Sequence, residues 1–290
     1  MRTTLDCLPC FLRQAVFAAG LGNLDAGQRH ALVCAVAELL PRLDMELSPP
    51  ENAVAVYRLI ATHLGVDDPF LQLKQQSTAG AMAMLPGLRQ AVTASADPLL
   101  ASLRFAIAGN IIDYGANHAF DAQQALDTCL AAPLAIDDYR DLATDLAGAR
   151  TVLYLADNCG EIVLDGLFLE RLAGKEVTVA VKESPIINDA TLADARASGL
   201  DRFAALISNG TGVPGTPLPR CSDSFRRLFA GADLVISKGQ GNFETLSEES
   251  RPIYFLLTVK CPVVARHVSE KTGMRIVNGD LLLMRNRFRA

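Results

Sequence analysis

Four short apolar runs in the second half of the chain each end in a polar loop, and this pattern constrains the fold more than any other feature. Residues 151–156 (TVLYLA) are typical of a buried strand, because the run is short and has no helical period. Such runs alternate with helical segments, which indicates βαβ units and a parallel sheet. We expect strands near residues 151–156, 177–181, 203–207, 233–237 and 262–265, with another near 275–277.

The first half of the chain reads as helices only. Ser48 and Glu51 form a predicted capping box with prolines in the first turn, and the helix that follows should end at Gly65. Asp25 and Gln28 play the same part for another helix. Further helices are expected over residues 7–19, 68–83, 86–95, 97–113, 120–131 and 135–146.

The length and composition bound the organisation of the protein. A chain of 290 residues is long enough for two domains, which we place at residues 1–147 (helical) and 148–290 (α/β). The net charge of −5 argues against a nucleic-acid partner. No apolar run approaches the ~20 residues of a membrane-spanning helix, and the N-terminus does not resemble a signal peptide. We therefore expect a cytoplasmic protein with no nucleic-acid or membrane partner; its oligomeric state stays open.

The seven cysteines, an odd number spread along the chain, do not resemble a secreted disulfide framework. Cys7 and Cys10 differ from the others, because the C-x-x-C spacing can hold a metal or cycle as a dithiol. No second C-x-x-C and no H-x-x-x-H completes a zinc site. A structural role and a metal or redox role both stay open. The histidines form no ligand spacing and are expected on the surface or in the core: His30, His63, His118 and His267.

Side chains with oxygen donors follow two of the predicted strands. Asp157 and Asn158 come directly after the first strand, and Asn188 and Asp189 follow the second. They should converge, because the carboxyl ends of parallel strands share one edge of a sheet. Hard cations such as Mg²⁺ take oxygen ligands and leave positions for water and phosphate. An ordinary turn and helix capping are the alternatives, but the matching loops favour a site for a divalent metal and an anion.

Two lysines also stand at strand ends, Lys182 and Lys238. After the second, the glycines at 239 and 241 would let the backbone approach an anion at a helix N-terminus. Position 244 is Glu, so the segment lacks the third glycine of a dinucleotide-binding motif. Two solvated lysines are the alternative to a phosphate site.

Asn110 and Asp113 share one face of an otherwise apolar predicted helix. Polar groups on a buried face cost free energy unless they are paired. The pair could be satisfied within the helical half or could line the crevice beside the metal.

Several of these motifs occur together in a known family. The segments DCLPCFLRQA, GNIIDYG, DNCGEIVLD, KESPIINDAT, Gly-Thr at 215–216 and KGQGNFETL occur in that order. The series resembles the DUF89 family of metal-dependent phosphatases, also called the damage-control phosphatase or ARMT1-like family, in its prokaryotic branch with an N-terminal C-x-x-C. The resemblance covers about residues 3 to 265. It departs from the family pattern at Cys159, where a small residue is more usual, and at Glu183, where glycine is common.

The resemblance implies a helical N-terminal domain and a three-layer α/β/α C-terminal domain with a mainly parallel sheet. It also implies that Asp157, Asn158 and Asp189 bind the metal and that Lys238 contacts the substrate phosphate. Together with Lys238, these residues form the predicted catalytic set.

We predict a phosphatase that uses a divalent metal (Mg, Mn, Co or Ni) to hydrolyse a small phosphorylated metabolite. Further residues are candidates for substrate contact: Lys182, Asn188, Lys238, Gly239, Gly241, Asn242, Asn110, Asp113 and Glu161. Haloacid-dehalogenase chemistry with Asp157 as nucleophile is disfavoured, because position 159 is Cys rather than Asp. The alternatives are a non-catalytic sensor of a phosphorylated metabolite and a metal or redox accessory protein centred on Cys7 and Cys10.

Overall fold

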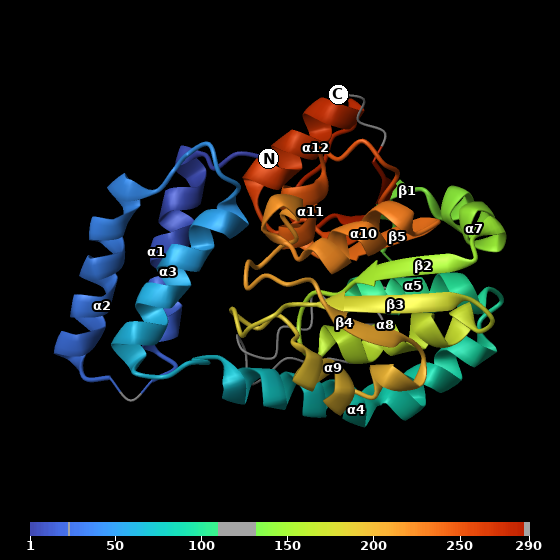
Figure 1. Cartoon of the computed structure of the whole chain (residues 1–290), viewed down its shortest axis with the longest axis horizontal. Coiled ribbons are helices and arrows are strands. Elements are labelled where there is room, and N and C mark those ends of the chain that lie inside the picture. Colours follow the sequence, from blue (N-terminus) through green and yellow to red (C-terminus); the bar gives the residue numbers. More distant parts are fainter. Residues whose placement is uncertain (23, 110–131, 287–290) are drawn as a thin grey trace.

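The first three helices form a small bundle at one side of the molecule (Figure 1). The computed structural model describes residues 1–22, 24–109 and 132–286. The bundle consists of α1 (Leu8–Ala19), α2 (Ala26–Leu39) and α3 (Pro49–Leu64). Its core also includes Ile186 and Val263 from the second half of the chain. The bundle therefore packs against the α/β part rather than standing apart from it.

The predicted caps of two bundle helices are confirmed. The Asp25 carboxylate accepts a hydrogen bond of 2.8 Å from the backbone N–H of Gln28 at the start of α2. At the start of α3, the backbone N–H of Ser48 donates to the Glu51 carboxylate at 3.1 Å. Gly65 ends α3 with φ 67°, a conformation that glycine adopts at little cost.

A single seven-stranded sheet has the order β1-β7-β6-β5-β2-β3-β4. All neighbouring strands are parallel except β6 and β7. The strands are β1 (Leu134–Asp137), β2 (Thr151–Leu155), β3 (Glu176–Val181), β4 (Ala205–Ser208), β5 (Leu234–Lys238), β6 (Tyr254–Thr258) and β7 (Leu281–Arg285). The strands expected near 151–156, 177–181, 203–207 and 233–237 are thereby confirmed.

Helices cover both faces of the sheet, so the predicted three-layer α/β/α architecture is confirmed. One face packs against α4 (Leu71–Ala94), α5 (Pro98–Ala108), α7 (Tyr139–Gly148), α8 (Glu161–Leu169) and α9 (Leu192–Ala197). The other packs against α10 (Asp223–Gly231), α11 (Gln240–Leu246) and α12 (Pro262–Thr272). Each face of the sheet has its own hydrophobic core. Successive residues of β2 point into opposite cores, so Tyr154 lies in the first and Leu153 in the second.

Three of the predicted helices and strands differ from the structure. Residues 262–265 form the first turn of α12, where Pro262 fits because its missing N–H has no helical partner there. No strand occurs at 275–277; the last strand in the described residues is β7, which pairs antiparallel with β6. The helix predicted over 135–146 is split, because its first residues add β1 to the sheet edge beside β7.

The helices predicted at 68–83 and 86–95 are one continuous helix, α4, with Pro86 inside it. A proline in a helix interior costs about 3 kcal/mol. Ala81, Leu88 and Val92 are buried in the core shared with the sheet, and each large apolar side chain so buried contributes roughly 1.5–3 kcal/mol. Packing on both sides of the proline thus outweighs its cost. The helix predicted at 120–131 lies outside the described residues.

The strand order reverses beside β2. From β2 the chain moves to β3 and β4 on one side of the sheet, and to β5 and β6 on the other. In open parallel sheets, ligands bind outside the carboxyl ends of the strands at such a switch point. The division into domains at residues 147 and 148 stays a prediction, although α4, α5 and β1 precede it and pack with the sheet. In the described part of the chain, no helix combines the length and apolar character needed to span a bilayer.

Candidate active site

Asp157, Asn158 and Asp189 come together at the switch point. The first two follow β2 and the third lies in the loop after β3. Asn158 and Asp189 form an isolated antiparallel bridge, and the Ala190 N–H donates to the Asp157 carbonyl at 2.8 Å. The backbone thus fixes the two loops against each other and holds the three predicted ligands in one place.

The loop after β3 contains the only non-glycine residue with positive φ in the described structure, Ile187 at 46°. A β-branched residue is strained in this region. Two bonds beside it hold the loop in place: Asp189 N–H donates to Ile186 O at 3.1 Å, and Cys159 N–H donates to Asn188 O at 2.8 Å. Strained backbone of this kind persists where surrounding contacts fix it, and it is common at functional sites.

Two buried carboxylates at the switch point, those of Asp157 and Asp189, have raised pKa values. Burial raises the pKa of Asp157, and the charges of Glu161 and Asp189 raise it further against the opposing charge of Lys182. Burial also raises the pKa of Asp189 to about 6, although Lys182 opposes the shift. One carboxylate oxygen of Asp189, Oδ2, is buried without a hydrogen bond and lies 3.6 Å from the Lys182 ammonium. An additional cation here would favour the ionised carboxylates.

The Asn158 amide is the third of the predicted metal ligands. Its Nδ2 donates to Asp157 Oδ2 at 2.8 Å and to Glu161 Oε2 at 3.0 Å. A half-turn of the amide exchanges nitrogen for oxygen, which would give Asp157, Asn158 and Asp189 an all-oxygen donor set. In the parts of the chain that are described, no three His, Cys, Asp or Glu side chains could hold an ion by themselves. The residues therefore fit a hard cation that takes few protein ligands, such as Mg²⁺.

Lys238 is fully buried between two carboxylates. Its ammonium donates to Glu161 Oε1 at 2.7 Å and to Asp165 Oδ1 at 2.5 Å. Burial alone lowers the pKa of Lys238, but Asp165 and Glu161 outweigh that effect and hold it above its usual value. The group stays charged, and its charge is used within the fold. Its predicted contact with a substrate phosphate stays a prediction.

Lys182 is also buried, but its hydrogen-bond partners are neutral. The ammonium donates to Gly215 O at 3.0 Å and to Asn242 Oδ1 at 3.1 Å. Asn242 in turn donates to Ala156 O at 3.1 Å and to Lys238 O at 2.8 Å, which ties the ends of β2 and β5 together. Asn242 thus holds Lys182 and the ends of these two strands in place, and its predicted contact with the substrate stays a prediction.

The two glycines after β5 allow close approach of protein groups. Gly239 has φ 78°, and a Cβ there would clash with the Asp157 carboxylate. A Cβ on Gly241 would clash with the backbone oxygen of Pro214. Larger residues at these positions would displace Asp157 or the loop after β4. A role for either glycine in anion binding stays a prediction.

The remaining predicted residues are outside the described part of the chain or in the helices. Asn110, Asp113 and His118 lie outside the described residues. Cys7 is buried in the bundle and Cys10 is half-buried, both as free thiols. His30 and His63 bond within their own helices, and His267 packs edge-on against Phe243.

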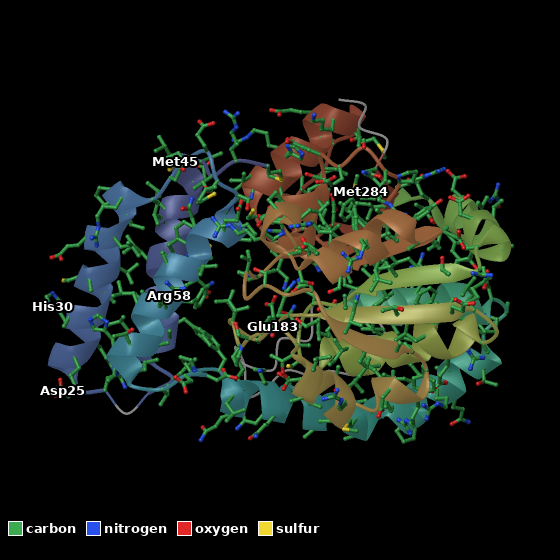
Figure 2. The ribbon with its side chains drawn as sticks, in the orientation of Figure 1. Asp25, His30, Met45, Arg58, Glu183 and Met284 are labelled. Atoms are coloured by element: carbon green, nitrogen blue, oxygen red, sulfur yellow. The ribbon has the colours of Figure 1, made fainter. Side chains whose placement is uncertain are left out.

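The two departures from the family pattern both lie near the site. Cys159 is buried, and its thiol donates to the Asp189 carbonyl at 3.9 Å. Burial, with the charge of Asp194 adding to it, raises the pKa of this thiol, so it stays protonated. Glu183 lies at the carboxyl edge of the sheet and accepts a hydrogen bond from the Ser208 hydroxyl (Figure 2).

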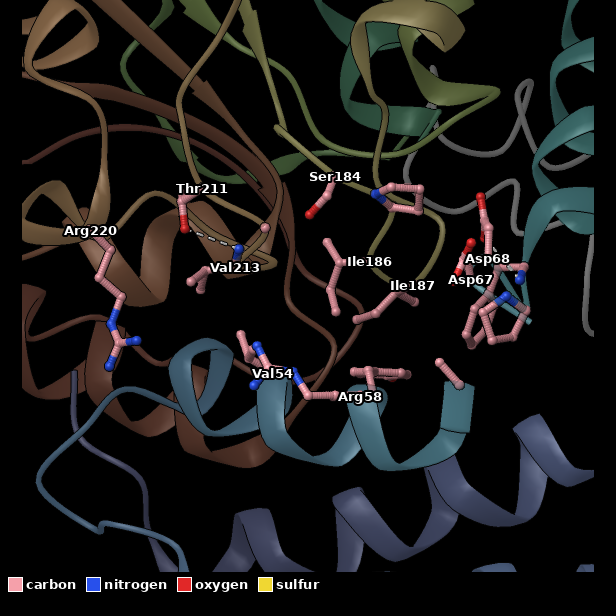
Figure 3. Close-up of a pocket in the computed structure, with 16 residues that line it drawn as sticks. Val54, Arg58, Asp67, Asp68, Ser184, Ile186, Ile187, Thr211, Val213 and Arg220 are labelled. Carbon is pink, nitrogen blue, oxygen red and sulfur yellow. Dashed lines mark hydrogen bonds between the residues drawn. The ribbon is translucent and has the colours of Figure 1, made fainter. Parts of the chain in front are cut away.

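A cleft of about 730 Å³ opens between α3 and the loops that follow β3 and β4 (Figure 3). Tyr57 lines it from α3, and burial followed by the charges of Cys10 and Asp189 raises the pKa of this tyrosine. Asp189 N–H donates to the carbonyl of the cleft residue Ile186 at 3.1 Å, so the cleft adjoins the carboxylates and has space for a small molecule.

Sequence reasoning missed Asp165 and the α3 side of the cleft. Asp165 stands four residues after Glu161 in an otherwise apolar helix, EIVLDGLFL, and this isolated charge was an available signal. The face of α3 gave no such signal, because its residues resemble those of an ordinary amphipathic helix.

Comparisons with known proteins agree with this architecture. The family model of the damage-control phosphatase ARMT1-like domain matches residues 3–276. A damage-control phosphatase of Pyrococcus horikoshii is 34% identical over 296 residues, covering 100% of each chain. A damage-control phosphatase of Archaeoglobus fulgidus is 34% identical, covering 94% of this chain and 97% of its own. A crystal structure of a DUF89 family protein from P. horikoshii superposes with a TM-score of 0.86 at 32% identity, covering 99% of this chain and 100% of the other.

Proposed function

Because the chain belongs to the damage-control phosphatase ARMT1-like (DUF89) family, we propose that it is a divalent-metal-dependent phosphatase. Its substrate is a small phosphorylated metabolite, and its setting is the cytoplasm. One observation carries the metal dependence: Asp189 Oδ2 is buried without a hydrogen bond beside the carboxylates of Asp157 and Glu161.

Asp157, Asn158 and Asp189 would hold the metal, which is Mg, Mn, Co or Ni. A bound divalent ion polarises the phosphoryl oxygens and lowers the pKa of a bound water. The two carboxylates contribute negative charge to the ion from adjoining loops. The bridge between Asn158 and Asp189 keeps these loops in register.

The other residues of the site bind the phosphate and hold the ligands. Lys182 brings a positive charge to within 3.6 Å of Asp189, where it offsets charge on the phosphoryl group. The 3.0 Å hydrogen bond that the Asn158 amide donates to Glu161 would be given up when the amide turns its oxygen to the metal. Lys238 holds the Glu161 side chain in place through a 2.7 Å ion pair. The remaining candidates for substrate contact are Asn188, Asn242 and the loop of Gly239 and Gly241.

The test is hydrolysis of p-nitrophenyl phosphate after removal of metal with a chelator. Activity should be absent in excess chelator and should return with Mg²⁺, Mn²⁺, Co²⁺ or Ni²⁺. Asp189→Asn should abolish the metal-restored rate, whereas Asp201→Asn, at an exposed position, should leave it unchanged. Full activity of the wild type in excess chelator contradicts metal dependence. Binding of phosphorylated metabolites without any turnover would instead identify a sensor.

A further inference from the structure

The cleft beside the carboxylates has two walls of different origin. One wall is a face of α3, made by Val54, Tyr57, Arg58 and Ala61 at helical spacing. The other consists of residues shortly before the predicted metal ligand Asp189 and of the loop after β4: Ser184, Pro185, Ile186, Ile187, Thr211, Gly212 and Val213. The helical bundle thus forms one side of the space next to the candidate metal site.

Short links join this cleft to the phosphate-binding groups. Asp189 N–H donates to Ile186 O at 3.1 Å, so a cleft residue and a ligand belong to one turn. On the other loop, Lys182 donates to Gly215 O at 3.0 Å, three residues after Gly212. A substrate whose phosphate lies at Asp157 and Asp189 would therefore extend the rest of its structure into the cleft.

The charged side chains that line the cleft differ in their pairing. Arg220 pairs with Glu51 at 3.0 Å, and Asp68 pairs with Lys74 at 3.0 Å. Arg58 is exposed, and its guanidinium has no ion pair or hydrogen bond to any described residue. Figure 3 shows Arg220 at one end of the cleft and the acidic pair Asp67 and Asp68 at the other, with Arg58 between them.

We propose that Arg58 binds a second anionic group of the substrate, a carboxylate or a second phosphoryl group, while the first phosphate lies at the metal site. This inference rests on the proposed phosphatase function. A guanidinium recognises either group with paired, charge-assisted hydrogen bonds. The apolar side chains of Val54, Ile186 and Val213 pack against the carbon skeleton between the two anions. Arg58 is thus a specificity-determining residue contributed by the helical bundle.

The test compares substrates that differ only in the second anion. Glycerol 3-phosphate has none, 3-phosphoglycerate adds a carboxylate, and fructose 1,6-bisphosphate adds a phosphate to fructose 1-phosphate. Arg58→Met should lower kcat/KM about 10- to 100-fold for the compound carrying the recognised second anion, mainly through KM, as expected for one lost charged hydrogen-bonding group. It should change kcat/KM less than about twofold for the partner of that pair that carries the phosphate as its single anionic group. The pair in which Arg58→Met has the larger effect shows whether the second anionic group is a carboxylate or a phosphoryl group.

Arg140→Met is the matched control, because Arg140 is an exposed arginine on α7, which lies across the molecule from α3 (Figure 1). Arg140→Met should leave kcat/KM unchanged for every compound of the two pairs. An equal effect of Arg58→Met on substrates with one and with two anionic groups, or no effect on either, overturns the assignment of Arg58, while hydrolysis itself supports the phosphatase. If no phosphate ester is hydrolysed, the proposed function fails. Calorimetry then measures how tightly the wild type and Arg58→Met bind the same compounds. Equal affinity of the two proteins for the compound with two anionic groups overturns the assignment of Arg58.

Discussion

Lys182 and Lys238 occupy equivalent places in the sheet, since each stands at the carboxyl end of a strand beside β2 and each is buried. Their partners differ. Two carboxylates hold Lys238, whereas a backbone oxygen and an amide oxygen hold Lys182, with Asp189 at 3.6 Å. The comparison teaches that burial and position in a strand do not determine the role of a lysine. The charge of Lys238 is balanced by two carboxylates within the fold, whereas the carboxylate beside Lys182 is that of Asp189, a predicted metal ligand.

The largest expected effect follows from removing the ammonium of Lys238. Lys238→Met leaves Glu161 and Asp165 buried without their cation, and breaking a buried ion pair in this way costs about 3–5 kcal/mol. Denaturant unfolding should show this loss in the free energy of unfolding. The double variant Lys238→Met, Asp165→Leu should recover at least about 1 kcal/mol, because one uncompensated charge is gone. A single variant as stable as wild type would contradict a structural role for this lysine.

Lys182→Met should affect catalysis more than stability. Its lost hydrogen bonds have neutral acceptors, so we expect unfolding to lose about 1–2 kcal/mol. The kcat/KM for p-nitrophenyl phosphate should fall about 100- to 1000-fold, the scale for losing one group that stabilises developing charge. Unchanged kcat/KM in Lys182→Met, together with a larger loss in a folded Lys238 variant, would reverse the comparison.

The loops that follow β3 and β5, the strands that lead to Lys182 and Lys238, also differ in their backbone conformation. The loop after β5 places glycine at positive φ, Gly239, whereas the loop after β3 places Ile187 there. Both Ile187→Gly and Ile187→Ala remove the side chain, but only glycine adopts φ 46° without strain. Ile187→Gly should therefore be about 1 kcal/mol more stable than Ile187→Ala. Thermal unfolding of the two variants measures this difference, and greater stability of the alanine variant would show that the loop relaxes.

The sequence predicted features that are encoded in short segments better than contacts between residues far apart in the chain. The strands that lead into Asp157, Lys182 and Lys238 are short apolar runs that end in polar residues, and all of these strands form as expected. The strand β6 was missed although YFLLT is a short apolar run like β2, because the strand expected in this part of the chain was placed at 262–265, which begins α12. The partners of Lys238 could not be deduced, because Asp165 and Glu161 lie 73 and 77 residues away in the chain.

The most direct measurement is anomalous X-ray scattering from crystals of the wild-type protein grown with Mn²⁺. The account predicts one strong manganese peak at the switch point, bordered by oxygens of Asp157, Asn158 and Asp189. Manganese at Cys7 and Cys10, or no peak beside these three residues at a saturating Mn²⁺ concentration, would contradict the account.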